Sequence, residues 1–417
     1  MTGIDRELIS TCVHCGFCLP TCPTWDLWRE EMDSPRGRIY LMEGLADGTL
    51  QLNRTVVEHF DRCLGCMACV SSCPSGVLYD RLIEQTRATI EQEFRRPRRE
   101  RALRSAVLTV VARPRRLRRA LKLAPVGRHL PLPGFLRPLA ELAPRWRAAE
   151  APPELTGALG EQTARVGLLT GCVQRVLFGD VNAATARVLA AHGYEVAAPR
   201  TQDCCGALAV HAGRRKTGLE LARKTIDAFD AAGVDIVASN AAGCGSNLKD
   251  YGHLLADDPR YAERATAFSA RVRDVSELLA GAEARTEPRR LELRVALQDS
   301  CHLAHAQGLR AEQRAMLSRV PGLEVAEVED QALCCGSAGI YNLVQPEAAG
   351  ELGRRKAERV LATRADAYAA ANPGCLVQVT AALRRADHPL PAFHPVELVD
   401  ASLRGVDAGE LLRQARR

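Results

Sequence analysis

The sequence predicts two unlike parts, a small cysteine-rich α+β domain at the N-terminus and a larger α/β region made of two similar halves. Three observations predict this division. Eight of the sixteen cysteines lie between Cys12 and Cys73, none lies between Cys73 and Cys172, and eight lie from Cys172 to Cys375. The early cysteines form two runs with identical spacing. The later ones repeat a Cys-Cys-Gly motif among alternating strand and helix patterns. We therefore expect units at 1–93, 94–160, 161–285 and 286–417.

The two early runs both have the form C-x2-C-x2-C-x3-C-P, and they end in Cys22-Pro23 and Cys73-Pro74. Three thiolates two residues apart can hold three corners of a [4Fe–4S] cube, while the fourth cysteine of each run ligates the other cluster. Structural zinc sites favour pairs of cysteines with a longer gap. The spacing thus predicts a ferredoxin-like domain with two [4Fe–4S] clusters. The expected ligands are Cys12, Cys15, Cys18 and Cys73 for one, and Cys63, Cys66, Cys69 and Cys22 for the other.

Forty residues separate Cys22 from Cys63, more than a compact ferredoxin needs. This insert contains Ser-Pro-Arg-Gly-Arg-Ile-Tyr at 34–40, followed by a helical pattern through Leu45. Two roles stay open for it: a spacer helix that covers the clusters, or a docking surface for a redox partner.

The remaining composition narrows the class of protein. The N-terminus lacks the features of a secretory signal, and no apolar stretch is long enough to span a bilayer. We expect a cytoplasmic protein whose thiols stay reduced, which disfavours disulfides and favours metal binding. Aromatic residues make up only 4%, so stacking on nucleic acid is not expected.

Positive charge is concentrated between the two parts. Residues 94–147 carry a net charge of +14, whereas the whole chain carries +6. Prolines interrupt this segment, and short amphipathic pieces lie at Leu103–Val111 and Leu117–Leu123. No nucleic-acid-binding motif accompanies the charge. Two readings remain, contact with an anionic membrane surface, or a solvated linker that docks on acidic partner subunits. We favour the linker.

The two C-terminal halves share their cysteine spacing. Between Cys172 and Cys204 lie 31 residues, and between Cys301 and Cys334 lie 32; the following gaps contain 38 and 39 residues. Strands are expected at Val166–Thr170, Glu195–Ala198 and Val234–Ser239, and near Leu293–Leu297, Leu323–Val328 and Asp366–Ala370. Helices are expected at Val181–His192, Leu208–Ala232 and Ser246–Leu255. This alternation predicts parallel sheets, with cysteines near the carboxyl ends of strands.

Four thiols in each half could hold an iron–sulfur cluster or zinc, or undergo thiol–disulfide chemistry. Cys301, Cys334, Cys335 and Cys375 are the better candidates for a further metal centre, because adjacent cysteines form poor disulfides and Gly336 lets both face one site. Cys172, Cys204, Cys205 and Cys244 are the weaker set. His302 and His305 could ligate or hydrogen-bond.

With these motifs in view, the chain resembles the iron–sulfur subunits of glycolate oxidase (glycolate dehydrogenase). The resemblance rests on the two cysteine runs, on residues 34–40, on Gly-Cys-Val-Gln at 171–174, on Gly-Cys-Gly at 243–245 and on Cys-Cys-Gly-Ser-Ala-Gly at 334–339. It implies a complex with FAD-binding subunits that oxidises glycolate to glyoxylate. This chain would carry electrons toward a quinone, from the cytoplasm or from the inner face of the membrane. No dinucleotide-binding fingerprint occurs in the sequence, so FAD is expected only on partner subunits.

The Cys-Cys-Gly repeats are also similar to those of heterodisulfide reductase, of lactate-utilisation proteins and of the anaerobic glycerol-3-phosphate dehydrogenase iron–sulfur subunit. Heterodisulfide reductase has a fifth cysteine per repeat, where this chain has Asn247 and Gln378. Alternative functions are therefore an iron–sulfur subunit of a lactate or glycerol-3-phosphate dehydrogenase, a disulfide reductase, and an iron–sulfur sensor. Only the resemblance selects glycolate, since the substrate would bind another subunit.

Overall fold

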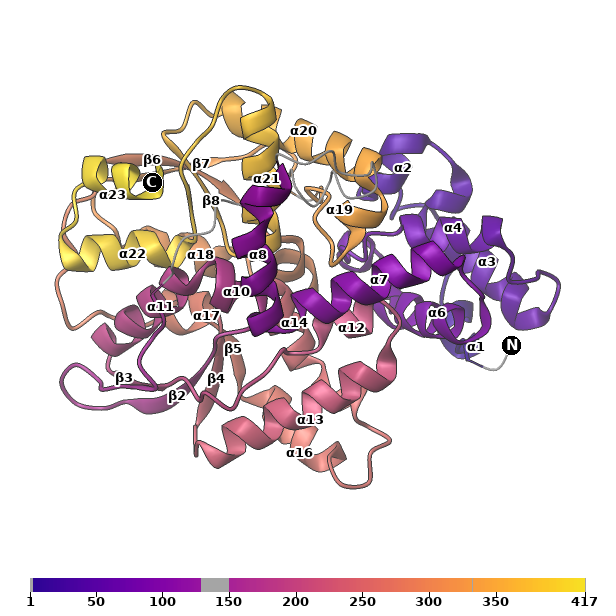
Figure 1. Ribbon diagram of the computed structural model, residues 1–417, viewed down its shortest axis with the longest axis horizontal. Helices are drawn as coiled ribbons and strands as arrows, with labels where there is room; N and C mark the ends of the chain where they lie inside the picture. Colours follow the sequence, from indigo (N-terminus) through magenta and orange to yellow (C-terminus); the bar gives the residue numbers. More distant parts are fainter. Residues whose placement is uncertain (1–2, 129–149, 332, 417) are drawn as a thin grey trace.

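The computed structural model describes residues 3–128, 150–331 and 333–416. Three bodies pack together in it (Figure 1): the N-terminal helical domain, the first repeat and the second repeat. Residues 129–149 of the expected connector lie outside the described residues, and so do its prolines from Pro131 to Pro144.

The N-terminal domain is helical. Its helices are α1 (Arg6–Ser10), α2 (Pro23–Trp28), the 3₁₀ turn η1 (Glu31–Asp33), α3 (Pro35–Asp47), α4 (Arg54–Arg62), α5 (Ala68–Ser71) and α6 (Tyr79–Glu93). No strand occurs between residues 3 and 93, so the expected α+β ferredoxin-like fold is not confirmed. The insert supplies α3 and α4, and the side chains of Ser34 and Asn53 cap them by accepting hydrogen bonds from Gly37 N and Val56 N. A core centred on Met42, Leu45 and Phe60 takes the place of a sheet.

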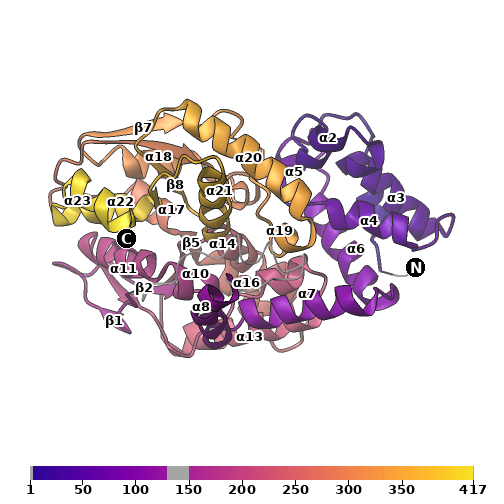
Figure 2. The same cartoon turned by 45° about the horizontal axis from the view of Figure 1, so that its top comes forward.

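Two helices of the basic segment follow, α7 (Arg98–Val111) and α8 (Pro114–Arg128). Pro97 and Pro114 stand at helix starts, where proline is tolerated because no amide hydrogen bond is lost. Val107 and Leu108 of α7 pack with Leu208 of the first repeat and Ile340 of the second. The described part is therefore no solvated linker: the helices bury their apolar side against both repeats. Figures 1 and 2 both show α7 running from the N-terminal domain toward the repeats.

The first repeat contains a five-stranded sheet of order β1-β3-β2-β4-β5. All neighbouring strands run parallel except β1, which pairs antiparallel with β3. The strands are β1 (Leu155–Thr156), β2 (Ala164–Leu169), β3 (Tyr194–Ala197), β4 (Ile236–Ser239) and β5 (Val272–Asp274). The helices are α10 (Val173–Leu177), α11 (Gly179–Ala191), α12 (Ala207–His211), α13 (Arg215–Ala231), α14 (Ala242–Lys249), α15 (Tyr251–Leu254), α16 (Ala262–Ala270) and α17 (Val275–Ala280).

The second repeat contains a four-stranded parallel sheet of order β7-β6-β8-β9. Its strands are β6 (Leu293–Gln298), β7 (Leu323–Glu327), β8 (Ala367–Ala370) and β9 (Ala392–Phe393). Its helices are the π-helical η3 (His302–Ala306), α18 (Ala311–Leu317), α19 (Tyr341–Val344), α20 (Pro346–Ala362), α21 (Pro373–Arg385), α22 (Pro395–Arg404) and α23 (Ala408–Arg416).

The sequence located these repeats well. Two parallel-sheet halves are confirmed, and every expected strand has a counterpart. The expected helix Leu208–Ala232 is instead two helices, α12 and α13. They are separated at Gly213, whose φ of 78° lies in the left-handed region that ends helices. The expected helix Ser246–Leu255 likewise appears as α14 and α15.

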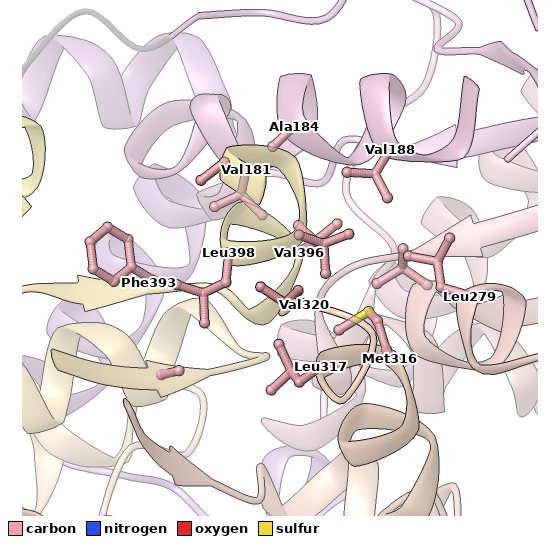
Figure 3. Packing of buried hydrophobic residues seen from close by; sticks show 14 of the residues in the cluster. Val181, Ala184, Val188, Leu279, Met316, Leu317, Val320, Phe393, Val396 and Leu398 are labelled. Atoms are coloured by element: carbon pink, nitrogen blue, oxygen red, sulfur yellow. The ribbon is translucent and has the colours of Figure 1, made fainter. Parts of the chain in front are cut away.

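The two repeats share one hydrophobic core. Helix α11 packs on α22, and α17 packs on α18. In each pair, one helix comes from the first repeat and the other from the second. Val188, Leu279, Leu317 and Leu398 meet in this core (Figure 3). Among the described residues, none of the helices combines the length and the apolar character that crossing a membrane requires.

Candidate iron–sulfur sites

The first candidate site, called site 1, surrounds a cavity lined by the expected Cys12, Cys15, Cys18 and Cys73 and also by Cys69, which lines the cavity of site 2 as well. The loop adopts left-handed backbone conformations at His14 and Gly16, with φ of 53° and 87°. Cys15 is exposed, and the three other thiols are partly buried. Burial raises the pKa of Cys12, with the neighbouring Cys73 also contributing, and burial raises the pKa of Cys18 to about 11.

The second, called site 2, surrounds a cavity lined by Cys22, Cys63, Cys66 and Cys69. The Gly65 N–H donates to Cys63 Sγ at 3.4 Å, and the Tyr79 hydroxyl donates to it at 3.7 Å. Burial raises the pKa of Cys63, but the guanidinium groups of Arg38 and Arg87 and the hydrogen bonds from Gly65 and Tyr79 together outweigh it, so that the net pKa is lowered. Burial raises the pKa of Cys66 and Cys69.

Each cavity thus brings together one expected set of four thiols, including the crossed pair of Cys73 with the first run and Cys22 with the second. Four thiols around a small cavity are the donor set that a [4Fe–4S] cluster takes. No three or more His, Cys, Asp or Glu side chains of the described residues are arranged to hold a single metal ion. A cube of four irons keeps its thiolates further apart than a single ion does, so this finding concerns single ions such as zinc and not clusters. Zinc binding is not confirmed.

The cysteines of each repeat also come together. In the first repeat, the thiol of Cys204 lies beside those of Cys172 and Cys205, and the thiol of Cys205 lies beside that of Cys244. In the second repeat, the thiol of Cys334 lies beside those of Cys301 and Cys335, and the thiol of Cys335 lies beside that of Cys375. Gly206 and Gly336 both have φ of 89°, and this left-handed turn follows each Cys-Cys pair. Hydrogen bonds from Cys334 and Cys375 lower the pKa of Cys335 well below its usual value.

The positions of the two missing cysteines have a structural role. Asn247 Nδ2 donates to Cys205 O at 2.8 Å, and Gln378 Nε2 donates to Ala349 O at 2.7 Å. Both amides satisfy carbonyl groups beside the Cys-Cys-Gly turns. Each repeat therefore presents four thiols, as the sequence indicated.

Site 2 lies against the second repeat. Leu64, Cys66 and Ala68 pack with Cys301 and Cys334 in one buried cluster. A hydrogen bond of 2.7 Å joins Ser71 Oγ to His305 Nδ1, so His305 connects the two bodies. The second repeat in turn contacts the first, since Ala242 N donates to Ala371 O at 3.1 Å. Three cysteine groups thus follow one another inward: site 1, site 2 and the set of the second repeat.

Sequence reasoning missed several residues around site 2. Arg38, Tyr79 and Arg87 act on Cys63 from helices outside the cysteine runs. The similarity of residues 34–40 to a known family was the only signal for Arg38, and it gave no role. His302 lies 5.3 Å from His211, ring centre to ring centre, and burial lowers its pKa to about 3. His302 is therefore neutral.

Comparison with known proteins agrees with this arrangement. A family model described as "4Fe-4S dicluster domain" matches residues 8–77, and a model described as "Cysteine-rich domain" matches residues 166–249 and 295–380. Fold, cysteine arrangement and family models together define an iron–sulfur protein of the electron-transfer class, with one domain of the 4Fe-4S dicluster family and two cysteine-rich domains.

Relatives narrow the class. A "Probable glycolate oxidase iron-sulfur subunit" of Bacillus subtilis is 36% identical over 99% of this chain and 95% of its own length. A "Glycolate oxidase iron-sulfur subunit" of Escherichia coli is 37% identical over 95% of each chain. A lactate utilization protein of an Exiguobacterium species is 25% identical over 57% of this chain and 98% of its own length. The chain therefore belongs to the family of glycolate oxidase iron–sulfur subunits.

Proposed function

We propose that this chain is the electron-transfer subunit of a flavin-dependent glycolate dehydrogenase, in which FAD-binding partner subunits oxidise glycolate to glyoxylate. The observation that carries the proposal is the position of site 2, which is buried between the exposed site 1 and the cysteines of the second repeat. Such a series connects the surface with the interior of the chain. The names of the two full-length relatives support glycolate as the substrate of the complex.

In this proposal Cys12, Cys15, Cys18 and Cys73 hold one [4Fe–4S] cluster, and Cys63, Cys66, Cys69 and Cys22 hold the other. A bound cluster supplies storage for one electron. The chain contributes the thiolates and hydrogen bonds to sulfur from Gly65 and Tyr79. It also excludes water from site 2 by packing Leu64 against the second repeat.

The surface at which electrons enter is the rim of site 1. Val13, Phe17, Tyr40 and Leu78 are large apolar side chains that stay 46–68% exposed, and Val13 and Phe17 line the cavity of site 1 itself. An apolar rim beside a redox site fits a protein partner that brings its own cofactor close. We assign this rim to the flavoprotein partner.

The exit side involves the basic helices. Arg115, Arg116, Arg118 and Arg119 of α8 are exposed, whereas Leu117 and Leu121 are buried against Val176 of the first repeat. The apolar side of α8 is thus not free to enter a bilayer, and its charge is free to meet acidic groups. We propose that this face associates with acidic partner subunits or with the anionic surface of the membrane that contains a quinone acceptor.

A tagged pull-down tests the function directly. The eluate should contain a flavoprotein and should reduce a dye with glycolate, and lactate and glycerol 3-phosphate serve as competing substrates. Tyr40→Asp should weaken the capture of the flavoprotein at least tenfold while leaving the iron content unchanged, because Tyr40 is 58% exposed and does not line the cavity of site 1. The control is Leu155→Asp, because Leu155 is an apolar side chain of the first repeat that is 52% exposed. Val111 would not serve as a control position, because its side chain is partly buried. Equal loss in both variants, or a chain that purifies without flavin, would contradict the proposal.

We also propose a further metal centre on Cys301, Cys334, Cys335 and Cys375. The proximity of these four thiols to one another and the packing of Cys301 and Cys334 with Cys66 support it. Anaerobically purified full-length protein should then contain more than the about eight irons that two cubes supply. Cys335→Ala should remove the excess, and Cys205→Ala tests the first repeat in the same way. An iron content that stays at about eight, with no zinc, would remove this centre from the proposal.

A further inference from the structure

Two arginines in the first turn of α3 face different sites. Arg36 lines the cavity of site 1, Arg38 lines the cavity of site 2, and Pro35 lines both. They lie two residues apart, and residues so spaced on a helix point to different sides. The start of α3 therefore places one guanidinium beside each set of thiols.

Arg38 is held in place from all sides. Its side chain is only 1% exposed. It donates from Nε to His59 O at 2.6 Å, from Nη1 to Thr24 Oγ1 at 3.1 Å and from Nη2 to Asp33 Oδ1 at 3.3 Å. The Thr24 hydroxyl in turn lies 3.2 Å from Cys22 Sγ. Arg38 therefore reaches a site 2 thiol through one hydroxyl group.

The charges around Arg38 do not cancel. Asp33 is fully buried and contacts two arginines, Arg38 at 3.3 Å and Arg62 at 2.7 Å, as well as His59 Nδ1 at 3.0 Å. Arg62 also pairs with the half-exposed Glu58. Arg87 adds another positive charge near Cys63. Burying an uncompensated cation is costly, so a negative group beside Arg38 is needed to offset that cost. Thiolates with a bound cluster are such a group.

Arg36 has a different environment. Its side chain is 31% exposed and donates two hydrogen bonds to the Glu31 carboxylate, from Nε at 2.7 Å and from Nη2 at 3.2 Å. Its third hydrogen bond goes to His14 O at 3.2 Å. One carboxylate thus balances its charge, and nearby water screens what remains. The field of Arg36 at site 1 is therefore weaker than that of Arg38 at site 2.

We propose that Arg38 raises the reduction potential of site 2, and that Arg36 acts only weakly on site 1. Reduction adds one negative charge to a cluster, and a nearby cation in a low-dielectric interior stabilises that charge more than one at the surface does. Arg38 thereby offsets the decrease in reduction potential that burial causes at site 2. Electrons that arrive at the exposed site 1 are drawn inward. This inference rests on the ligand assignment proposed above.

Potentiometric titration followed by electron paramagnetic resonance tests the proposal on the full-length, cluster-loaded chain. At a fixed potential, Arg38→Met should change the ratio of oxidised to reduced site 2 at least tenfold toward oxidised, which is about 59 mV for a one-electron couple. The ratio at site 1 should change less than about twofold. Arg36→Met should change site 1 less than about threefold. Cys22→Ala and Cys15→Ala assign the two signals.

Arg62→Met is the matched control, because it removes the other arginine that Asp33 contacts without touching the cavity of site 2. Its effect on site 2 should be smaller than that of Arg38→Met. If Arg38→Met does not fold, Arg87→Met decides, since Arg87 is only partly buried and should shift site 2 in the same direction. Arg38→Lys keeps the positive charge, so the reduction potential of site 2 in this variant should stay close to that of the wild type. A purely structural role of Arg38 predicts that Arg38→Lys shifts the potential as Arg38→Met does.

An unchanged site 2 potential in Arg38→Met, or equal shifts at both sites, would overturn the proposal. If Arg38→Met does not fold, an unchanged site 2 potential in Arg87→Met would also overturn it. These titrations need neither glycolate nor a partner. A failed pull-down therefore counts against the proposed function alone, and an absent shift counts against the role of Arg38 alone.

Discussion

The crossed ligand sets give the sharpest prediction for this chain, because two equivalent substitutions should damage opposite sites. Cys22 ends the first run but lies in the cavity of site 2, and Cys73 ends the second run but lies in the cavity of site 1. Cys22→Ala should therefore abolish the cluster on Cys63, Cys66 and Cys69. Cys73→Ala should abolish the cluster on the first run. Alanine is preferred to serine because a serine oxygen can itself act as a ligand.

The size of the effect follows from the cluster composition. Each cube contains four irons, so either variant should lose about four irons per chain if the depleted site empties completely. The reduced wild-type protein should show the broadened resonance of two interacting centres. Each variant should show a single isolated centre, and the two remaining spectra should differ. Site 1 contains the exposed Cys15 and site 2 is buried, so the two centres have different surroundings.

The assay is iron analysis combined with electron paramagnetic resonance of anaerobically reduced full-length protein. Circular dichroism serves as a control for folding, because Cys22 packs beside α2 and Thr24. The crossed ligand sets are wrong if Cys22→Ala loses the same signal as Cys15→Ala. In that case each run would hold its own cluster, and the cavities would not mark the ligand sets.

Two further predictions concern the repeats and the basic helices. Leu398 is fully buried in the core that both repeats share, so Leu398→Ala should cost about 2–5 kcal/mol of stability. Hydrogen exchange should rise in both β2 and β6, and a rise in β6 alone would show that the repeats unfold independently. Replacing the exposed arginines of α8 with glutamate should abolish salt-sensitive association with partner or with anionic vesicles. Association that is unchanged, or that high salt does not weaken in the wild type, would leave this face without a binding role. The arginines in question are Arg115, Arg116, Arg118 and Arg119.

Local patterns in the sequence were enough to predict the repeats. Short apolar runs such as Val166–Thr170 form buried parallel strands, and those strands place Cys172 and Cys301 at their carboxyl ends. The matched cysteine gaps predicted which thiols meet, because two copies of one fold place equivalent residues at equivalent points. The N-terminal fold was harder to predict. Four-cysteine spacing describes the loops that hold a cluster but not the elements that support them. The helical pattern through Leu45 did indicate α3, but nothing indicated that the described residues up to Glu93 would form helices without a strand.

Contacts between the bodies could not be predicted from local patterns. Nothing near Ser71 indicates His305, which follows 234 positions later, and nothing in the proline-rich segment indicates that Val107 meets Ile340. The charge of Arg38 was visible as a residue type, but its burial depends on Asp33, Thr24 and His59 closing around it. Such environments arise only from the tertiary structure.

The difference in exposure between the two sites has a consequence for how the protein ages in air. Cys15 is the one exposed cysteine among the described residues, while Cys22, Cys63 and Cys66 are buried. Dissolved oxygen and chelators reach exposed thiolates first, and oxidation of cysteine follows accessibility. Decay should therefore begin at site 1 and leave site 2 intact for longer. A preparation handled in air would retain a single, well-shielded centre, and it would have lost the one that we propose as the entry point for electrons.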